Sequence, residues 1–137
     1  MNENIESKKQ EILDEIFLKK EDTLKRLEEI VKKSQQDFSI DLETLEIFLK
    51  EHIQKLSDKI LRLLIAFFLM KEKGLIKYDS INLSEISKRL NVKSTSLSKP
   101  LGELIKRGFV RRSSEGSYSI IHHKILEVFE EENAQNK

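Results

Sequence analysis

Basic and hydroxyl side chains gathered in one part of the chain are the residues that could do chemistry. Between Ser80 and Lys124 there are nine Lys and Arg against three Glu, a net charge of +6, so the rest of the chain carries +1 − 6 = −5. Ammonium and guanidinium groups pair with anions, and hydroxyl groups donate hydrogen bonds to them. A charge asymmetry of this size inside an almost neutral chain indicates a polyanionic partner such as a nucleic acid.

Several other kinds of chemistry are excluded or disfavoured by composition. The 137 residues include no cysteine, which excludes disulfide scaffolds, cysteine-based zinc sites and thiol chemistry. The chain contains no G-x-S-x-G, Walker A, H-E-x-x-H or G-x-G-x-x-G motif. His52, His122 and His123 lack carboxylates at metal-binding spacing. We therefore expect no enzyme activity, no cofactor and no metal.

The amino-terminal third is predicted to be helical and to mediate association. Residues 1–34 contain no glycine or proline, and an apolar seam that only Lys20 interrupts predicts one long amphipathic helix. Such a polar helix needs a partner, which is either its own domain or a second copy of the chain in a coiled coil. The apolar residues that would face either partner are Leu13, Phe17, Leu24, Leu27 and Val31.

Two further helices are predicted before Gly74. Asp41 is placed to cap an amphipathic helix that carries Leu42, Leu45, Leu49, Ile53 and Leu56. From Ile60 to Met70, ten of eleven residues are apolar and only Arg62 interrupts them. Because a membrane span needs about 20 apolar residues, this stretch predicts a buried core helix that ends at Gly74. With no secretory signal pattern at the amino terminus, we expect a cytoplasmic protein with no membrane contact.

Shorter elements follow Tyr78. Asn82 is expected to cap a helix, a tight turn leads to a helix capped by Ser94 or Ser96, and a hairpin turns at Gly116. The predicted elements are a short strand at 81–83, helices at 83–90 and 94–107, strands at 109–112 and 117–121, and a last helix at 124–133.

The helix after Ser94 is expected to bury one face and expose a polar one. A 100° wheel places Leu97, Leu101, Leu104 and Ile105 inward and Thr95, Ser96, Lys99, Gly102, Glu103 and Lys106 outward. Two features oppose strong anion binding. Pro100 would destabilise a helix interior by roughly 3 kcal/mol unless it lies in the first turn, and Gly102 and Glu103 offer no positive charge.

The chain from about Lys59 to Ile121 resembles winged helix-turn-helix proteins of the MarR and ArsR regulator type. The resemblance is carried by the stretch INLSEISKRLNVKSTSLSKPLGELIKRGFVRRSSEGSYSI, from Ile81 to Ile120. In this resemblance ISKRL is the first helix of the motif, STSLSKPLGELIKRG the recognition helix and RRSSEGSYS the wing. It implies a mainly α fold with a small β-hairpin wing, in the α+β class. The expected domains are a helical extension at 1–56, the winged domain at 57–121 and a carboxy-terminal helix and tail at 122–137.

The resemblance implies a homodimeric transcription regulator that binds double-stranded DNA. It also implies dimerisation through the amino- and carboxy-terminal helices, and the dimer-interface residues expected on this basis are Leu13, Phe17, Leu24, Leu27, Val31, Ile125 and Phe129. The recognition helix would enter the major groove and the wing would contact the flanking groove or backbone. The expected DNA-binding residues are Lys93, Ser94, Thr95, Ser96, Ser98, Lys99, Lys106, Arg111, Arg112 and Ser114. Two alternatives stay open: a winged protein–protein interaction module that docks through its long amino-terminal helix, and a non-specific chromosome-binding protein.

Overall fold

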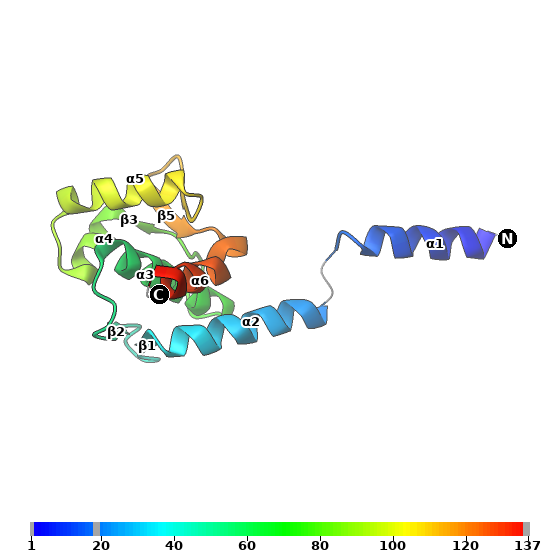
Figure 1. Cartoon of the computed structure of the whole chain (residues 1–137), viewed down its shortest axis with the longest axis horizontal. Coiled ribbons are helices and arrows are strands. Elements are labelled where there is room, and N and C mark those ends of the chain that lie inside the picture. Colours follow the sequence, from blue (N-terminus) through cyan, green and yellow to red (C-terminus); the bar gives the residue numbers. More distant parts are fainter. Residues whose placement is uncertain (1, 18–19, 136–137) are drawn as a thin grey trace. The chain divides into compact units, whose positions relative to one another are not determined.

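The computed structural model describes residues 2–17 and 20–135, with the side chains of 4–17 and 20–130. These residues form helices and two small antiparallel sheets, which agrees with the expected mainly helical α+β class (Figure 1). The chain divides into two compact units, Met1–Lys32 and Lys33–Lys137. The sequence had suggested a boundary after residue 56, whereas this division falls after Lys32.

The first unit holds helix α1 and most of helix α2, so the prediction of one unbroken helix over 1–34 is wrong. The bounds are α1 (Asn2–Asp14) and α2 (Lys20–Gln35). After α1 the amides of Glu15, Ile16 and Phe17 donate to carbonyls three residues back, at 3.3, 3.1 and 3.2 Å, and this tighter turn ends the helix. The described side chains of α1 are all exposed, so no packing within the chain holds the two helices in one line.

A β-hairpin replaces the helix expected after Asp41. Strand β1 (Phe38–Ile40) pairs antiparallel with β2 (Ile47–Leu49), with Ser39 opposite Phe48. Asp41 does form cap-like bonds, because its Oδ1 accepts from the amides of Glu43 at 2.8 Å and Thr44 at 3.1 Å. One turn later Leu45 adopts φ 61°, in the left-handed region, and the chain reverses into β2. Asp41 therefore stabilises a hairpin turn, and the predictions of a helix cap at Asp41 and of a helix after it are both wrong.

Helix α3 (Leu56–Glu72) is the buried helix that the apolar run predicted. It carries one buried charged side chain, that of Arg62. Arg62 is 0% exposed, and its Nε donates to Oδ2 of the buried Asp37 at 3.0 Å. Its Nη1 lies 3.7 Å from Asp58 Oδ1, and its guanidinium lies 5.4 Å from the ring centroid of Phe129. Asp37 also bonds His52 Nε2 at 2.8 Å. Through these contacts, the Arg62–Asp37 ion pair connects the segment before β1, helix α3 and the last helix.

The end of α3 was predicted correctly. Gly74 has φ 85°, its amide donates to the Lys71 carbonyl, and the Leu75 amide donates to the Met70 carbonyl. Across residues 2–17 and 20–135, no helix combines the length and apolar content that crossing a bilayer requires.

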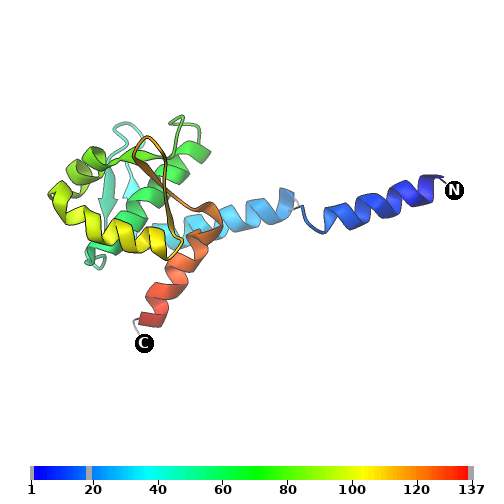
Figure 2. The same cartoon turned by 90° about the horizontal axis from the view of Figure 1, so that it is seen from above.

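The rest of the second unit packs around α3 in the expected order. A three-stranded sheet has the order β3-β5-β4, and α3 contacts β2, α4, α5 and β5. Figure 2 shows α5 (yellow) along its length and the β4–β5 hairpin (orange) that follows its carboxy-terminal end. The bounds are β3 (Ile81–Asn82), α4 (Leu83–Leu90), the 3-10 turn η1 (Ser94–Leu97), α5 (Ser98–Lys106), β4 (Val110–Arg112), β5 (Ser117–Ile120), the 3-10 turn η2 (His122–Lys124) and α6 (Ile125–Gln135).

Removing one partner of the buried ion pair is expected to destabilise the fold strongly. Asp37→Ala leaves the Arg62 guanidinium buried without its nearest carboxylate, which lowers the free energy of unfolding by about 3–5 kcal/mol. The double variant Asp37→Ala with Arg62→Met removes both charges and recovers most of that loss. Urea unfolding of the variants checks this, and a loss below about 1 kcal/mol in Asp37→Ala would contradict it.

Acid should weaken the hairpin turn through Asp41. The backbone amides of Thr44 and Glu43 lower the pKa of this carboxyl from its ordinary 3.8. Its stabilising effect is therefore present above the unfolded pKa and is lost as pH falls through the lower folded value. Asp41→Asn cannot titrate, so we expect wild type to be the more stable of the two at neutral pH and to lose this advantage in acid. Equal pH dependence of the two urea midpoints would contradict the assignment.

Candidate nucleic-acid interface

Helix α4 and the turn after it orient the surface that follows. As predicted, the Asn82 side chain accepts from the Glu85 amide at 2.8 Å and caps α4. Asn91 ends the helix in the left-handed region at φ 54°, and the Val92 amide donates to the Ser87 carbonyl. This tight turn leads directly into η1, so α4 and η1–α5 form two helices joined by a short turn.

The second helix starts later than expected, and this removes the difficulty with Pro100. Neither Ser94 nor Ser96 caps it: η1 begins after Lys93 and α5 begins after Leu97, both without a side-chain cap bond. Because α5 begins at Ser98, Pro100 is its third residue. Amides of the first turn have no partner within a helix, so proline loses no helical hydrogen bond there.

The predicted two faces of this helix are present with one exception. Leu97, Leu101 and Leu104 are buried, at 0, 2 and 1% exposure, whereas Ile105 is 38% exposed and does not belong to the core face. All the residues assigned to the outward face are exposed, namely Thr95, Ser96, Lys99, Gly102, Glu103 and Lys106. The leucines therefore fix the helix to the core and hold the polar face toward solvent.

The hairpin separates its two arginines by strand alternation, as predicted. Arg112 lies opposite Tyr118 in the register and Arg111 opposite Ser119. The Arg112 guanidinium covers the Tyr118 ring, 5.9 Å from its centroid, on the face where Tyr118 is buried. Arg111 is exposed on the other face and makes no side-chain hydrogen bond or ion pair with a described residue.

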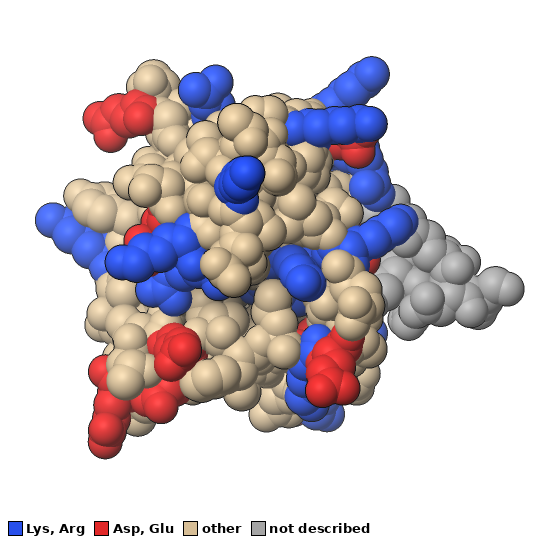
Figure 3. All heavy atoms as spheres, turned by 90° about the vertical axis from the view of Figure 1, so that its left-hand side faces the viewer, with Lys and Arg blue, Asp and Glu red and all other residues tan. Residues whose placement is uncertain are grey.

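The face that includes α4 and η1 carries many basic side chains. In Figure 3, Lys and Arg spread over the middle and upper parts of this view, the heights at which α4 and α5 lie in Figure 1. Within the described part of the chain, five of the nine basic residues make no ion pair, side-chain hydrogen bond or ring contact: Lys88, Lys93, Lys99, Lys106 and Arg111.

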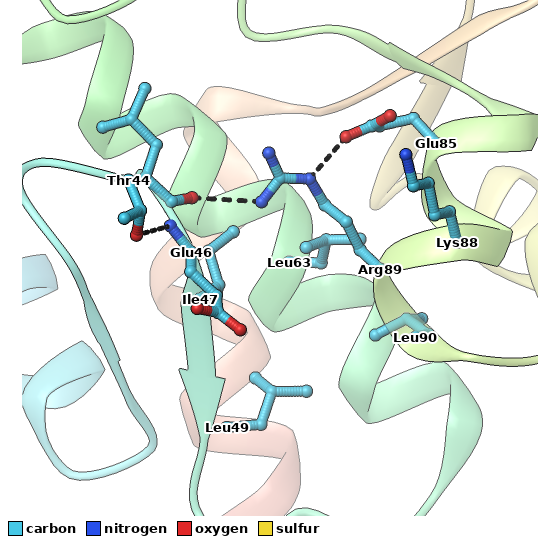
Figure 4. Close-up of a pocket in the computed structure, with 10 residues that line it drawn as sticks. Thr44, Glu46, Ile47, Leu49, Leu63, Glu85, Lys88, Arg89 and Leu90 are labelled. Carbon is cyan, nitrogen blue, oxygen red and sulfur yellow. Dashed lines mark hydrogen bonds and ion pairs between the residues drawn. The ribbon is translucent and has the colours of Figure 1, made fainter.

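Arg89, in contrast, has a structural role. Its Nε donates to Glu85 Oε1 at 2.7 Å, and its Nη1 donates to the Leu45 carbonyl at 3.1 Å (Figure 4). It also lies 4.9 Å from the ring centroid of Phe67. These contacts tie α4 to the β1–β2 turn across a cleft of about 450 Å³ that Leu63 and Leu90 also line. Lys124 likewise pairs with Glu127 at 2.8 Å and lies over Phe109.

The structure brings all the expected DNA-binding residues to the surface. Every one of them is exposed, and they come from the turn before η1, from η1–α5 and from the β4–β5 hairpin. They are Lys93, Ser94, Thr95, Ser96, Ser98, Lys99, Lys106, Arg111, Arg112 and Ser114.

The expected dimer residues divide into two groups. Leu13, Phe17, Leu24 and Val31 are exposed, at 42, 68, 57 and 37%, and Leu27 is half-buried. Ile125 and Phe129, on α6, are buried at 0 and 5% exposure. They belong to the core of the chain and are not accessible to a second copy.

Two of the three histidines, His52 and His122, serve as hydrogen-bond partners. His52, which was expected on a helix, lies in the turn after β2 and bonds Asp37. His122 Nε2 bonds Asp79 Oδ2 at 2.7 Å, and its ring lies 4.7 Å from that of Phe68. Among the described side chains, no three His, Asp or Glu residues form a group able to hold a metal ion.

Sequence reasoning missed one polar centre, formed by Asp37, Arg62 and His52. An arginine inside an apolar helix was a signal that a buried carboxylate must lie nearby, although the partner lies 25 residues earlier in the chain. Comparison with family models, curated proteins and solved structures found no match for this chain.

Proposed function

We propose that the second unit is a winged helix-turn-helix domain that binds double-stranded DNA and acts in transcription regulation. In this proposal η1–α5 enters the major groove and the β4–β5 hairpin is the wing. An α-helix fits the major groove, and its outward side chains reach base edges and phosphates there.

One observation carries this proposal. The solvent face of η1–α5 presents hydroxyl and ammonium groups with no ion pair or side-chain hydrogen bond among the described residues, including Thr95, Ser96 and Lys99. Buried leucines on the opposite face pack into the core. A positioned, polar and basic helix face is suited to a polyanion whose surface also offers hydrogen-bonding groups.

The position and charge of the β4–β5 hairpin also support double-stranded DNA as the partner. In Figure 1, α5 and the loop between β4 and β5 both lie along the upper edge of the second unit. Arg111 has no intramolecular partner among described residues and is the better candidate for a phosphate contact. Arg112 is held over Tyr118 and contributes mainly to the hairpin.

The first unit supplies the second half of the proposal, a homodimer. Exposed apolar side chains of the first unit, among them Phe17 in the turn after α1 and Leu24 on α2, need a partner to leave water. Two copies would present two recognition helices to a two-fold-symmetric site with half-sites about one helical turn apart. The same surface also suits another protein, so an interaction module is the second candidate function. In that case Leu24→Asp would abolish partner binding while Lys99→Glu would not.

The test is selection from a random-sequence duplex pool at two salt concentrations, with the mass in solution recorded. We expect a two-fold-symmetric motif to be enriched by a species of twice 16.1 kDa. Salt-sensitive binding without enrichment would replace regulation with non-specific chromosome binding. Absence of binding even at low salt would contradict the DNA proposal.

Single basic residues should change the salt dependence by predictable amounts. Lys99→Ala and Arg111→Ala each remove one phosphate contact, so the slope of log K against log salt becomes shallower by about 1. Arg112→Ala should change the slope less, because the Arg112 guanidinium lies over the Tyr118 ring within the hairpin. Lys55→Ala, which removes an exposed lysine directly before α3, is the matched control. Equal slopes in all four variants would argue against this interface.

A further inference from the structure

Neither the backbone conformation nor the packing of the folded chain requires a glycine at position 102. It lies in the interior of α5, and its φ is outside the left-handed region in which Gly74, Gly108 and Gly116 lie. A Cβ added there would meet nothing within 4 Å. Glycine in a helix interior is less favourable than alanine, so neither backbone geometry nor packing explains this residue.

Charged side chains surround this bare position. Lys99 lies one turn before Gly102 and Lys106 one turn after it, while Glu103 lies beside it. Glu103 is spaced to pair with both lysines, yet none of the three makes an ion pair with a described residue. The two lysines are seven positions apart, which corresponds to a rise of about 10.5 Å along the helix, close to the roughly 12 Å width of the major groove.

We infer that DNA comes closest to α5 at Gly102, and that Glu103 is a specificity-determining residue at that point. The inference rests on the proposed function and deepens it. Without a side chain at position 102, the helix backbone can approach the floor of the groove, and the lysines on either side reach phosphates at the two edges. This explains why the least favourable residue of the helix lies in the middle of its exposed face.

The charge of Glu103 restricts what it can face. A carboxylate is repelled by phosphates, so in the groove it must lie against a hydrogen-bond donor on a base edge. The cytosine N4 amino group is the donor that Glu and Asp side chains accept from in the major groove. Glu103 therefore favours a cytosine at one position of each half-site.

The series Gly102→Ala and Gly102→Leu separates stability from binding. Both residues favour a helix more than glycine does, so the melting temperature should rise by roughly 2–6 °C. Affinity for the selected duplex should fall in both variants, and by at least about tenfold for leucine. Gln36→Leu, which adds an exposed leucine in the turn between α2 and β1, away from both proposed interfaces, controls for a new apolar side chain.

The outcomes of the series are distinguishable. If wild type binds its duplex and Gly102→Leu binds equally well, closest approach at Gly102 is wrong and the proposed function stands. If wild type binds no duplex, the proposed function and this inference both fail.

Selection repeated with Glu103→Gln tests the specificity claim. We expect the cytosine preference to weaken at one position of each half-site while the remaining motif is unchanged. An identical motif from wild type and Glu103→Gln would overturn the role of Glu103.

Discussion

The buried ion pair between Arg62 and Asp37 is the constraint on which the second unit depends. A guanidinium that is 0% exposed cannot remain in an apolar interior without a carboxylate and further polar contacts. Asp37, Asp58 and the ring of Phe129 supply them at 3.0, 3.7 and 5.4 Å. These groups come from the segment before β1, from α3 and from α6, so one side chain fixes three parts of the chain relative to each other.

Helix α3 then becomes the platform for the remaining elements. It contacts β2, α4, α5 and β5, so the hairpin and the α4–η1–α5 segment are positioned by the same helix. Arg89 adds a second tie between α4 and the β1–β2 turn. Leu97, Leu101 and Leu104 hold the core face of α5 against the rest of the second unit. The opposite face, with its basic and hydroxyl side chains, is therefore already oriented before a partner binds, which lowers the cost of binding.

Local signals predicted the elements that local bonds determine. The ends of α3 and α4, the Asn82 cap and the hairpin turn at Gly116 all follow from residues within a few positions of one another. The β1–β2 hairpin was missed because Leu42, Leu45 and Leu49 have helical spacing and Asp41 forms the same cap bonds in either conformation. The difference lies in contacts distant in sequence, above all Asp37 with Arg62. The start of α5 at Ser98 was likewise set by the turn before it, and no cap residue marked it.

The candidate surface was more predictable than the fold around it, because exposure of a helix face follows from the burial of the opposite one. In the sequence, Gly102 and Glu103 were arguments against anion binding. The role that we infer for them rests on the open space around Gly102, which a count of charges does not consider.

The most direct test of the central claim is amide hydrogen exchange of the full chain with and without its selected duplex. Binding through the proposed face predicts added protection across 94–106 and 111–119, with little change in the β1–β2 hairpin. Protection confined to α1 and α2, or none at all, would contradict the account.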